Sequence, residues 1–120
     1  MKMQFDSDKI EQGYFDSRKN QKKYNKVFAE ELEKMLNFID NAECAYDVKM
    51  YPRYHMHLLH GDYDGIYSLS PDNKKSKWRV PALCINDNNE WWKPDQNNEE
   101  ITVLKKTKIF NLKEITDYHD

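Results

Sequence analysis

Histidine, lysine and arginine side chains are concentrated in one segment of this chain, between Tyr54 and Arg79. Imidazole has an ordinary pKa of about 6.5, so a histidine can take up or release a proton near neutral pH. Cleavage of RNA without a metal needs a base for the 2′-hydroxyl, an acid for the leaving 5′-oxygen and a cation for the charged phosphorane. The segment supplies all of these groups, in His55, His57, His60, Lys74, Lys75, Lys77 and Arg79.

Arg79 is the cation with the most informative context. In Lys77-Trp78-Arg79-Val80, strand alternation predicts that Trp78 and Val80 face the core while Lys77 and Arg79 share the opposite face. An arginine held on a strand can place two hydrogen bonds on a phosphate at little ordering cost. The alternative role is an exposed arginine in a surface salt bridge.

The histidines divide by the same rule. His55 and His57 share one face of their strand, but Leu58-Leu59 breaks the alternation and leaves the side of His60 undecided. His119 follows Tyr118 near the end of the sequence, where chains usually fray. An ordered role for His119 therefore requires that the last strand pair inside the sheet.

Metal and cofactor chemistry find no support in the residue pattern. His55-x-His57 lacks a third ligand at a supporting spacing, and the two cysteines, Cys44 and Cys84, form neither a metal motif nor a disulfide framework. We expect both cysteines to pack as small hydrophobic side chains. We expect no metal ion and no organic cofactor.

Composition limits the remaining classes. The 120 residues fit a single domain over 1–120, and 13% aromatic content argues against disorder although 33% of residues are charged. The net charge of −2 gives no global attraction to nucleic acid, so a polyanion site must be a local patch. No apolar run reaches the ~20 residues of a membrane span, and the N-terminus lacks the apolar core of a signal peptide, so we expect no membrane association and a cytoplasmic protein.

The periodicity changes once along the chain. A short helix capped at Ser7-Asp8 and stopped by Gly13 is predicted, followed by a longer helix from about Ser17 to Asn41 with apolar residues at three- and four-residue spacing. After Pro52 the period approaches two, and predicted strands cover 54–60, 66–70, 77–85, 101–104 and 109–115. This order predicts an α+β fold whose N-terminal helices pack on one face of a small antiparallel β-sheet.

Four ordered motifs resemble the HigB toxins of bacterial type II toxin–antitoxin systems, within the RelE/ParE superfamily. They are Tyr54-His55-Met56-His57-Leu58-Leu59-His60-Gly61-Asp62, Gly65-Ile66-Tyr67-Ser68-Leu69-Ser70, Lys77-Trp78-Arg79-Val80 and Asp117-Tyr118-His119. The resemblance covers about the last 100 residues and implies a RelE-like fold. It also implies a ribosome-dependent endonuclease that cuts mRNA in the decoding site of the 70S ribosome.

The resemblance implies roles for individual residues. Arg79 matches the family's catalytic arginine and His119 its terminal catalytic histidine, while His60 stands where a catalytic lysine is common. Substrate contacts are expected from His57, Lys74, Lys75, Lys77 and Tyr118. The implied partner is a HigA-like antitoxin with a helix-turn-helix domain, through which alone the toxin would meet operator DNA.

The sequence also departs from the family pattern. His60 replaces a lysine that stays cationic, Lys77 replaces a frequent asparagine, and the chain is slightly acidic where family members are usually basic. The segment 86–98 is a longer insertion, and its Trp91 and Trp92 either cover the core edge, contact an antitoxin or stack on a base.

Two other readings stay open. One is a ParE-like toxin that binds a protein such as DNA gyrase and cuts nothing. The other is a structural or degenerate module whose polar strand face only contacts a partner.

Overall fold

The computed structural model describes residues 1–117. Five α-helices are present in this range: α1 (Asp8–Phe15), α2 (Ser17–Lys23), α3 (Lys26–Asn41), α4 (Ala45–Lys49) and α5 (Glu100–Lys106). The strands are β1 (Lys2–Gln4), β2 (His57–Leu58), β3 (Tyr67–Leu69), β4 (Trp78–Ile85), β5 (Ile109–Leu112) and β6 (Thr116–Asp117), with short 3₁₀ turns η1 (Pro52–Tyr54) and η2 (Gly61–Tyr63). The α+β class and the N-terminal helices are confirmed.

The helix starts follow from side-chain caps. Ser7 accepts a hydrogen bond from the backbone N–H of Ile10 at the start of α1, as the sequence predicts, and α1 continues through Gly13 to Phe15. The long predicted helix is divided at Tyr24 and Asn25, because the Asn25 side chain accepts from the Phe28 N–H and starts α3 as a separate helix.

The sheet is mixed, so the expectation of a purely antiparallel sheet is wrong. Its order is β1-β5-β4-β3-β2, with β6 also paired to β4. All pairs are antiparallel except β1, which runs parallel to β5 with Met3 beside Phe110. This strand was not predicted, although Met1, Met3 and Phe5 alternate with polar residues. β1 is held by its pairing with β5, by packing of these apolar residues on the core, and by hydrogen bonds from the Met1 ammonium to carbonyls at the end of α3.

Two predicted strands have another structure. Residues 101–104 lie in helix α5, because Val103 and Leu104 are the only apolar positions there that reach the core and helical spacing puts both on one side. The predicted strand 54–60 is reduced to His57–Leu58, since η1 occupies Pro52–Tyr54 and His55 adopts a left-handed backbone with φ 48°.

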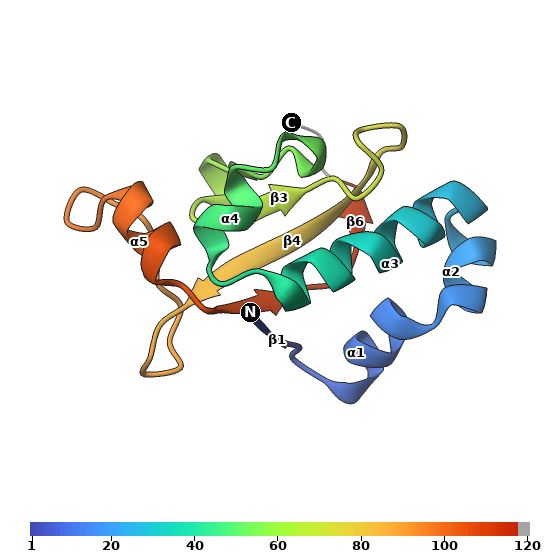
Figure 1. Ribbon diagram of the computed structural model, residues 1–120, viewed down its shortest axis with the longest axis horizontal. Coiled ribbons are helices and arrows are strands. Elements are labelled where there is room, and N and C mark those ends of the chain that lie inside the picture. Colours follow the sequence, from blue (N-terminus) through green and yellow to red (C-terminus); the bar gives the residue numbers. More distant parts are fainter. Residues whose placement is uncertain (118–120) are drawn as a thin grey trace.

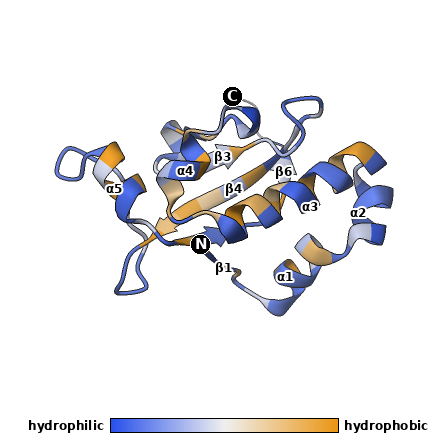
Figure 2. Ribbon diagram, viewed as in Figure 1, coloured by the Kyte–Doolittle hydropathy of each residue, from blue (hydrophilic) through white to orange (hydrophobic). Residues whose placement is uncertain are grey.

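The main core lies between the helices and one face of the sheet. Figure 1 shows α3 running along β4, the longest strand, with α4 beside it over the same sheet. Figure 2 shows the apolar stripe of α3 and the apolar β4 between polar outer surfaces. The helices contribute Phe28, Leu32, Met35, Ile39, Val48 and Val103, and the sheet contributes Tyr67, Leu69, Val80, Ala82, Cys84, Phe110 and Leu112.

A bulge separates β5 from β6. Lys113 donates to the Pro81 carbonyl, continuing the β5 register, but Thr116 lies opposite Arg79. Glu114 and Ile115 therefore both lie opposite Val80, which is one extra residue on that side of the ladder. The shift puts Thr116 and Asp117 opposite Arg79 and Trp78.

Among residues 1–117, no helix is long and apolar enough to cross a bilayer.

Candidate functional site

The candidate site lies on the face of the sheet opposite the helices, called here the second face. It carries His57 on β2, Ser68 on β3, and Arg79 and Pro81 on β4. His57 pairs with Ser68 and Ser68 with Pro81, and residues directly opposite share a side of an antiparallel sheet. Their strand neighbours Leu58, Tyr67, Leu69, Val80 and Ala82 belong to the core side. Alternation thus predicted the side of Arg79 and of His57 correctly.

Arg79 is half-buried and is held by its own turn. Its Nη1 donates to the Ser76 carbonyl at 2.6 Å and to the Trp78 carbonyl at 2.9 Å. No carboxylate within residues 1–117 forms an ion pair with it. The alternative role of Arg79, in a surface salt bridge, is therefore not observed within residues 1–117. The guanidinium keeps its positive charge and offers further N–H donors to an anion.

His57 is near Arg79 on the second face. By strand spacing the two Cα atoms are separated by two strands and two residues, roughly 12 Å, a gap that two long side chains and a phosphate can fill. The Nδ1 of His57 lies 2.8 Å from the carbonyl of His55. A carbonyl only accepts, so Nδ1 carries the proton and Nε2 is the basic nitrogen of the neutral ring.

His55 is a residue of this site to which the sequence analysis assigned no catalytic or substrate-binding role. It is one of four non-glycine residues with positive φ in the described chain, and its Nε2 is hydrogen-bonded to Oδ1 of Asn73, another of them. Lys74 follows with φ 62°. Strained backbone of this kind is kept where surrounding contacts fix it and is concentrated at functional sites.

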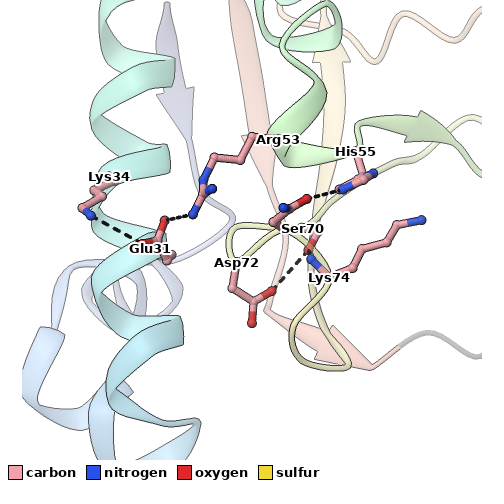
Figure 3. Close-up of polar contacts among 8 residues, drawn as sticks. Glu31, Lys34, Arg53, His55, Ser70, Asp72 and Lys74 are labelled. Atoms are coloured by element: carbon pink, nitrogen blue, oxygen red, sulfur yellow. Dashed lines mark hydrogen bonds and ion pairs between the residues drawn. The ribbon is translucent and has the colours of Figure 1, made fainter.

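Lys74 and Lys75 lie in the turn that this contact fixes. Ser70 Oγ accepts from the Lys74 N–H at 2.7 Å and donates to Asp72, which is 1% exposed. Figure 3 shows His55 directed at this turn and the Lys74 side chain extending away from it. Both lysine side chains are exposed, so the turn presents two cations beside the second face.

Ser68 is the second residue that sequence reasoning missed. It is 1% exposed, and its Oγ has no hydrogen-bond partner among the described residues. A buried hydroxyl without a partner costs about 1–3 kcal/mol, so such groups are rare and need an explanation. The alternation of Tyr67 and Leu69 toward the core was the available signal that Ser68 faces the side of His57.

The structure does not bring His60 together with Arg79. The register continues through the Leu59 N–H bond to the Ile66 carbonyl, which aligns His60 with Cys84, five residues or roughly 16 Å along β4 from Arg79. The His60 side chain is 79% exposed and lies 3.8 Å from Asp64, whose carboxylate also pairs with Lys93 at 2.7 Å. These contacts hold Asp64 charged, with its pKa lowered chiefly by the Lys93 hydrogen bond.

Lys77 is separated from Arg79 in a different way. β4 begins one residue later, at Trp78, and the Lys77 ammonium lies 5.0 Å from the Trp78 ring centroid and 3.7 Å from Asp117. Trp78 packs edge-on against Tyr24 on the helix side. The expectation that Lys77 shares the face of Arg79 is therefore wrong, because the ammonium turns toward the indole and the carboxylate.

The end of the chain is described as far as Asp117. β6 pairs with β4, so the condition for an ordered C-terminus is met up to that residue. The predicted site residues Tyr118 and His119 lie outside the described residues.

The insertion 86–98 closes the other end of the second face. Trp91 lies directly opposite Ile85 and is 45% exposed, while Trp92 donates its N–H to the Cys84 carbonyl and packs on the core. The two tryptophans thus differ: Trp92 covers the core edge, and Trp91 presents a ring near Leu83 and Ile85.

Among residues 1–117, no group of three or more His, Cys, Asp and Glu side chains is arranged to hold a metal ion. Comparisons with protein-family models, curated proteins and solved structures found no match to this chain.

Proposed function

We propose that the chain is a HigB-like toxin of a type II toxin–antitoxin system with a RelE-like fold, and that it cleaves mRNA in the decoding site of the ribosome. The observation that carries the proposal is Arg79. It is a strand-borne arginine without a carboxylate partner in the described chain, and it shares a face with His57. The four ordered motifs support the same reading.

The geometry suggests a division of roles. Arg79 binds the scissile phosphate and stabilises the charge that develops on its oxygens. His57, with Nδ1 held by the His55 carbonyl, has Nε2 oriented for proton transfer. Lys74 and Lys75 steer the polyanion toward this face. The role of second proton carrier is assigned to His119, and this assignment comes from the family motif alone.

The ParE-like alternative has its own supporting observation. Trp91 is 45% exposed and lies opposite the buried Ile85 at the far end of the second face, and such an exposed ring suits a protein target as well as an RNA base. Arg79, which has no carboxylate partner within residues 1–117, and His57 on the same face favour the nuclease, since contact with a protein does not need them.

The test is expression of wild type and Arg79→Ala in bacteria, with mapping of 5′ ends on a reporter mRNA. Cuts in phase with codons in wild type, lost in Arg79→Ala, are expected. Growth arrest with DNA damage and no cuts would replace the nuclease with the ParE-like reading. If wild type causes neither mRNA cuts nor growth arrest, the reading as a partner-binding module remains.

A further inference from the structure

A polar groove of about 670 Å³ lies on the helix side of the molecule, away from the second face. It runs between α3 and the segment that leads into β2. Its walls are Glu31, Lys34, Asn37, Phe38, Asn41, Tyr51, Arg53 and Tyr54. Nothing in the site described above uses these residues.

Aromatic rings form one wall of this groove. Phe38 and Tyr51 are stacked, with centroids 4.7 Å apart and planes 16° apart. Tyr54 meets both rings edge-on, at 5.5 Å from Phe38 and 5.2 Å from Tyr51. The three centroids thus form a nearly equilateral triangle, so Tyr54 does not cover the face of Tyr51 that points away from Phe38. Tyr51 is 39% exposed, and its outer face is the one that neither Phe38 nor Tyr54 covers.

The charge next to Tyr51 is positive. Glu31 is shared by two cations, with Arg53 at 2.8 Å and Lys34 at 3.4 Å, and Figure 3 shows both directed at its carboxylate. One carboxylate against two cations leaves a net charge of +1 in the groove. The shared pairing also holds the Arg53 guanidinium in place, which suits it to contact a phosphate without further ordering.

Two amides complete the lining. Asn41 donates to the Asn37 carbonyl at 2.8 Å and lies 3.4 Å from the Asn37 side-chain oxygen. The side-chain N–H groups of Asn37 and the side-chain oxygen of Asn41 take part in neither of these two bonds. Amide donors and acceptors are groups that can hydrogen-bond the edge of a nucleobase.

We propose that this groove binds a base of single-stranded RNA stacked on the outer face of Tyr51, with the adjoining phosphate at Arg53 and Lys34. The inference rests on the proposed function, because it places a second contact for the RNA that Arg79 engages. β2 is an edge strand of the sheet, and the four residue steps from Arg53 to His57 span at most about 14 Å. One short oligonucleotide that passes over this edge reaches both places.

The experiment measures binding of a fluorescent 2′-O-methyl hexaadenylate, which cannot be cleaved at a 2′-hydroxyl, to the full-length protein at low salt. An abasic hexamer with the same backbone is measured in parallel. Stacking of one base on an aromatic ring is worth about five- to 150-fold in affinity. We expect Tyr51→Ala to weaken hexaadenylate binding by about tenfold and to leave abasic binding unchanged, whereas Tyr51→Phe retains the wild-type affinity.

Phe15→Ala is the matched control, since Phe15 is 56% exposed but lies at the end of α1, outside the groove. A second readout needs no variant: the ring protons of Tyr51 should shift upfield in NMR spectra of the wild type when hexaadenylate is added. Equal loss of affinity in Phe15→Ala and Tyr51→Ala, or Tyr51 signals that do not move at saturation, would overturn the proposal.

The two proposals can fail separately. If binding depends on Tyr51 but the protein cuts no mRNA on ribosomes, the proposed base site stands and the proposed nuclease activity is wrong. If cleavage depends on Arg79 but hexaadenylate binding does not depend on Tyr51, the proposed nuclease activity stands and the proposed base site is wrong.

Discussion

Ser68 lies directly opposite His57 in the pairing of β3 with β2, and its buried hydroxyl has no partner among the described residues. The arrangement brings a hydroxyl without a partner next to an imidazole on the same face as Arg79. A hydroxyl that makes no hydrogen bond within residues 1–117 is available to a bound phosphate or 2′-hydroxyl when neighbouring side chains move.

We therefore expect Ser68→Ala to separate stability from activity. Since the Ser68 hydroxyl makes no hydrogen bond within residues 1–117, the free energy of unfolding of Ser68→Ala should stay within about 0.5 kcal/mol of wild type or rise. Cleavage in the ribosome assay should fall by about tenfold, as for loss of one hydrogen bond to the reacting group. Urea unfolding and cleavage rates measure the two effects. A variant destabilised by several kcal/mol would mean that the hydroxyl has a structural partner.

Arg79→Lys should behave almost like Arg79→Ala. Lysine keeps the charge but lacks the planar group that Ser76 and Trp78 carbonyls hold at 2.6 and 2.9 Å. Loss of a well-placed donor to a developing oxyanion costs about 10²–10³-fold in rate. Single-turnover cleavage on programmed ribosomes measures this loss, with the exposed Arg18→Ala on α2 as the control. Wild-type rates in Arg79→Lys would show that only charge matters there.

His57→Ala should lower cleavage more than His60→Ala does. His57 shares the second face with Arg79, whereas His60 is aligned with Cys84 and lies beside Asp64. Loss of a proton-transfer group typically costs 10²–10⁴-fold. Rates of both variants across pH 5–9 give the comparison. A larger loss in His60→Ala would restore the family assignment of the proton carrier at that position.

The Glu31–Arg53 ion pair should make the stability of the fold depend on pH in the acidic range. The Arg53 hydrogen bond is the largest cause of the lowered pKa of Glu31, so the pair stabilises the fold above the ordinary glutamate pKa and ceases to do so as pH falls through the lowered value. Arg53→Gln should therefore have a lower Tm than wild type at pH 7, and the difference should shrink as pH falls below about 4. Thermal unfolding across pH 3–7 is the measurement. A Tm difference that persists unchanged at pH 3 would assign it to lost packing.

The two cysteines should differ sharply in reactivity. Burial raises the pKa of the Cys84 thiol to about 12, and the residue is 1% exposed, whereas Cys44 is only half-buried at the start of α4. One thiol per chain should react with an aromatic disulfide reagent at pH 8, and the second only on unfolding. Cys44→Ser identifies the fast thiol. Two equally fast thiols would contradict the placement of Cys84 in the core.

Much of the fold could be predicted from local pattern. The apolar stripe of α3, the cap at Ser7, and the alternation around Trp78, Arg79 and Val80 follow from residue type and spacing. The same alternation placed His57 on the face of Arg79. In these segments one periodic face is buried, and the sequence alone records which face that is.

Other features depend on contacts between distant segments. α5 has too few apolar residues to distinguish a helix from a strand, and β1 is held by its parallel pairing with β5 and by contacts with the end of α3. The Lys77 ammonium lies beside Trp78 and Asp117, and His55, which has positive φ, is hydrogen-bonded to Asn73.

The sequence by itself thus determined which residue types are available for proton transfer and phosphate binding, and on which strand faces most of them lie. Tertiary structure decided which of them meet. Register aligns His60 with Cys84, and the bulge at Glu114 and Ile115 sets Thr116 opposite Arg79. Strand alternation is a local property with a period of two, whereas register and bulges arise from pairing between distant segments.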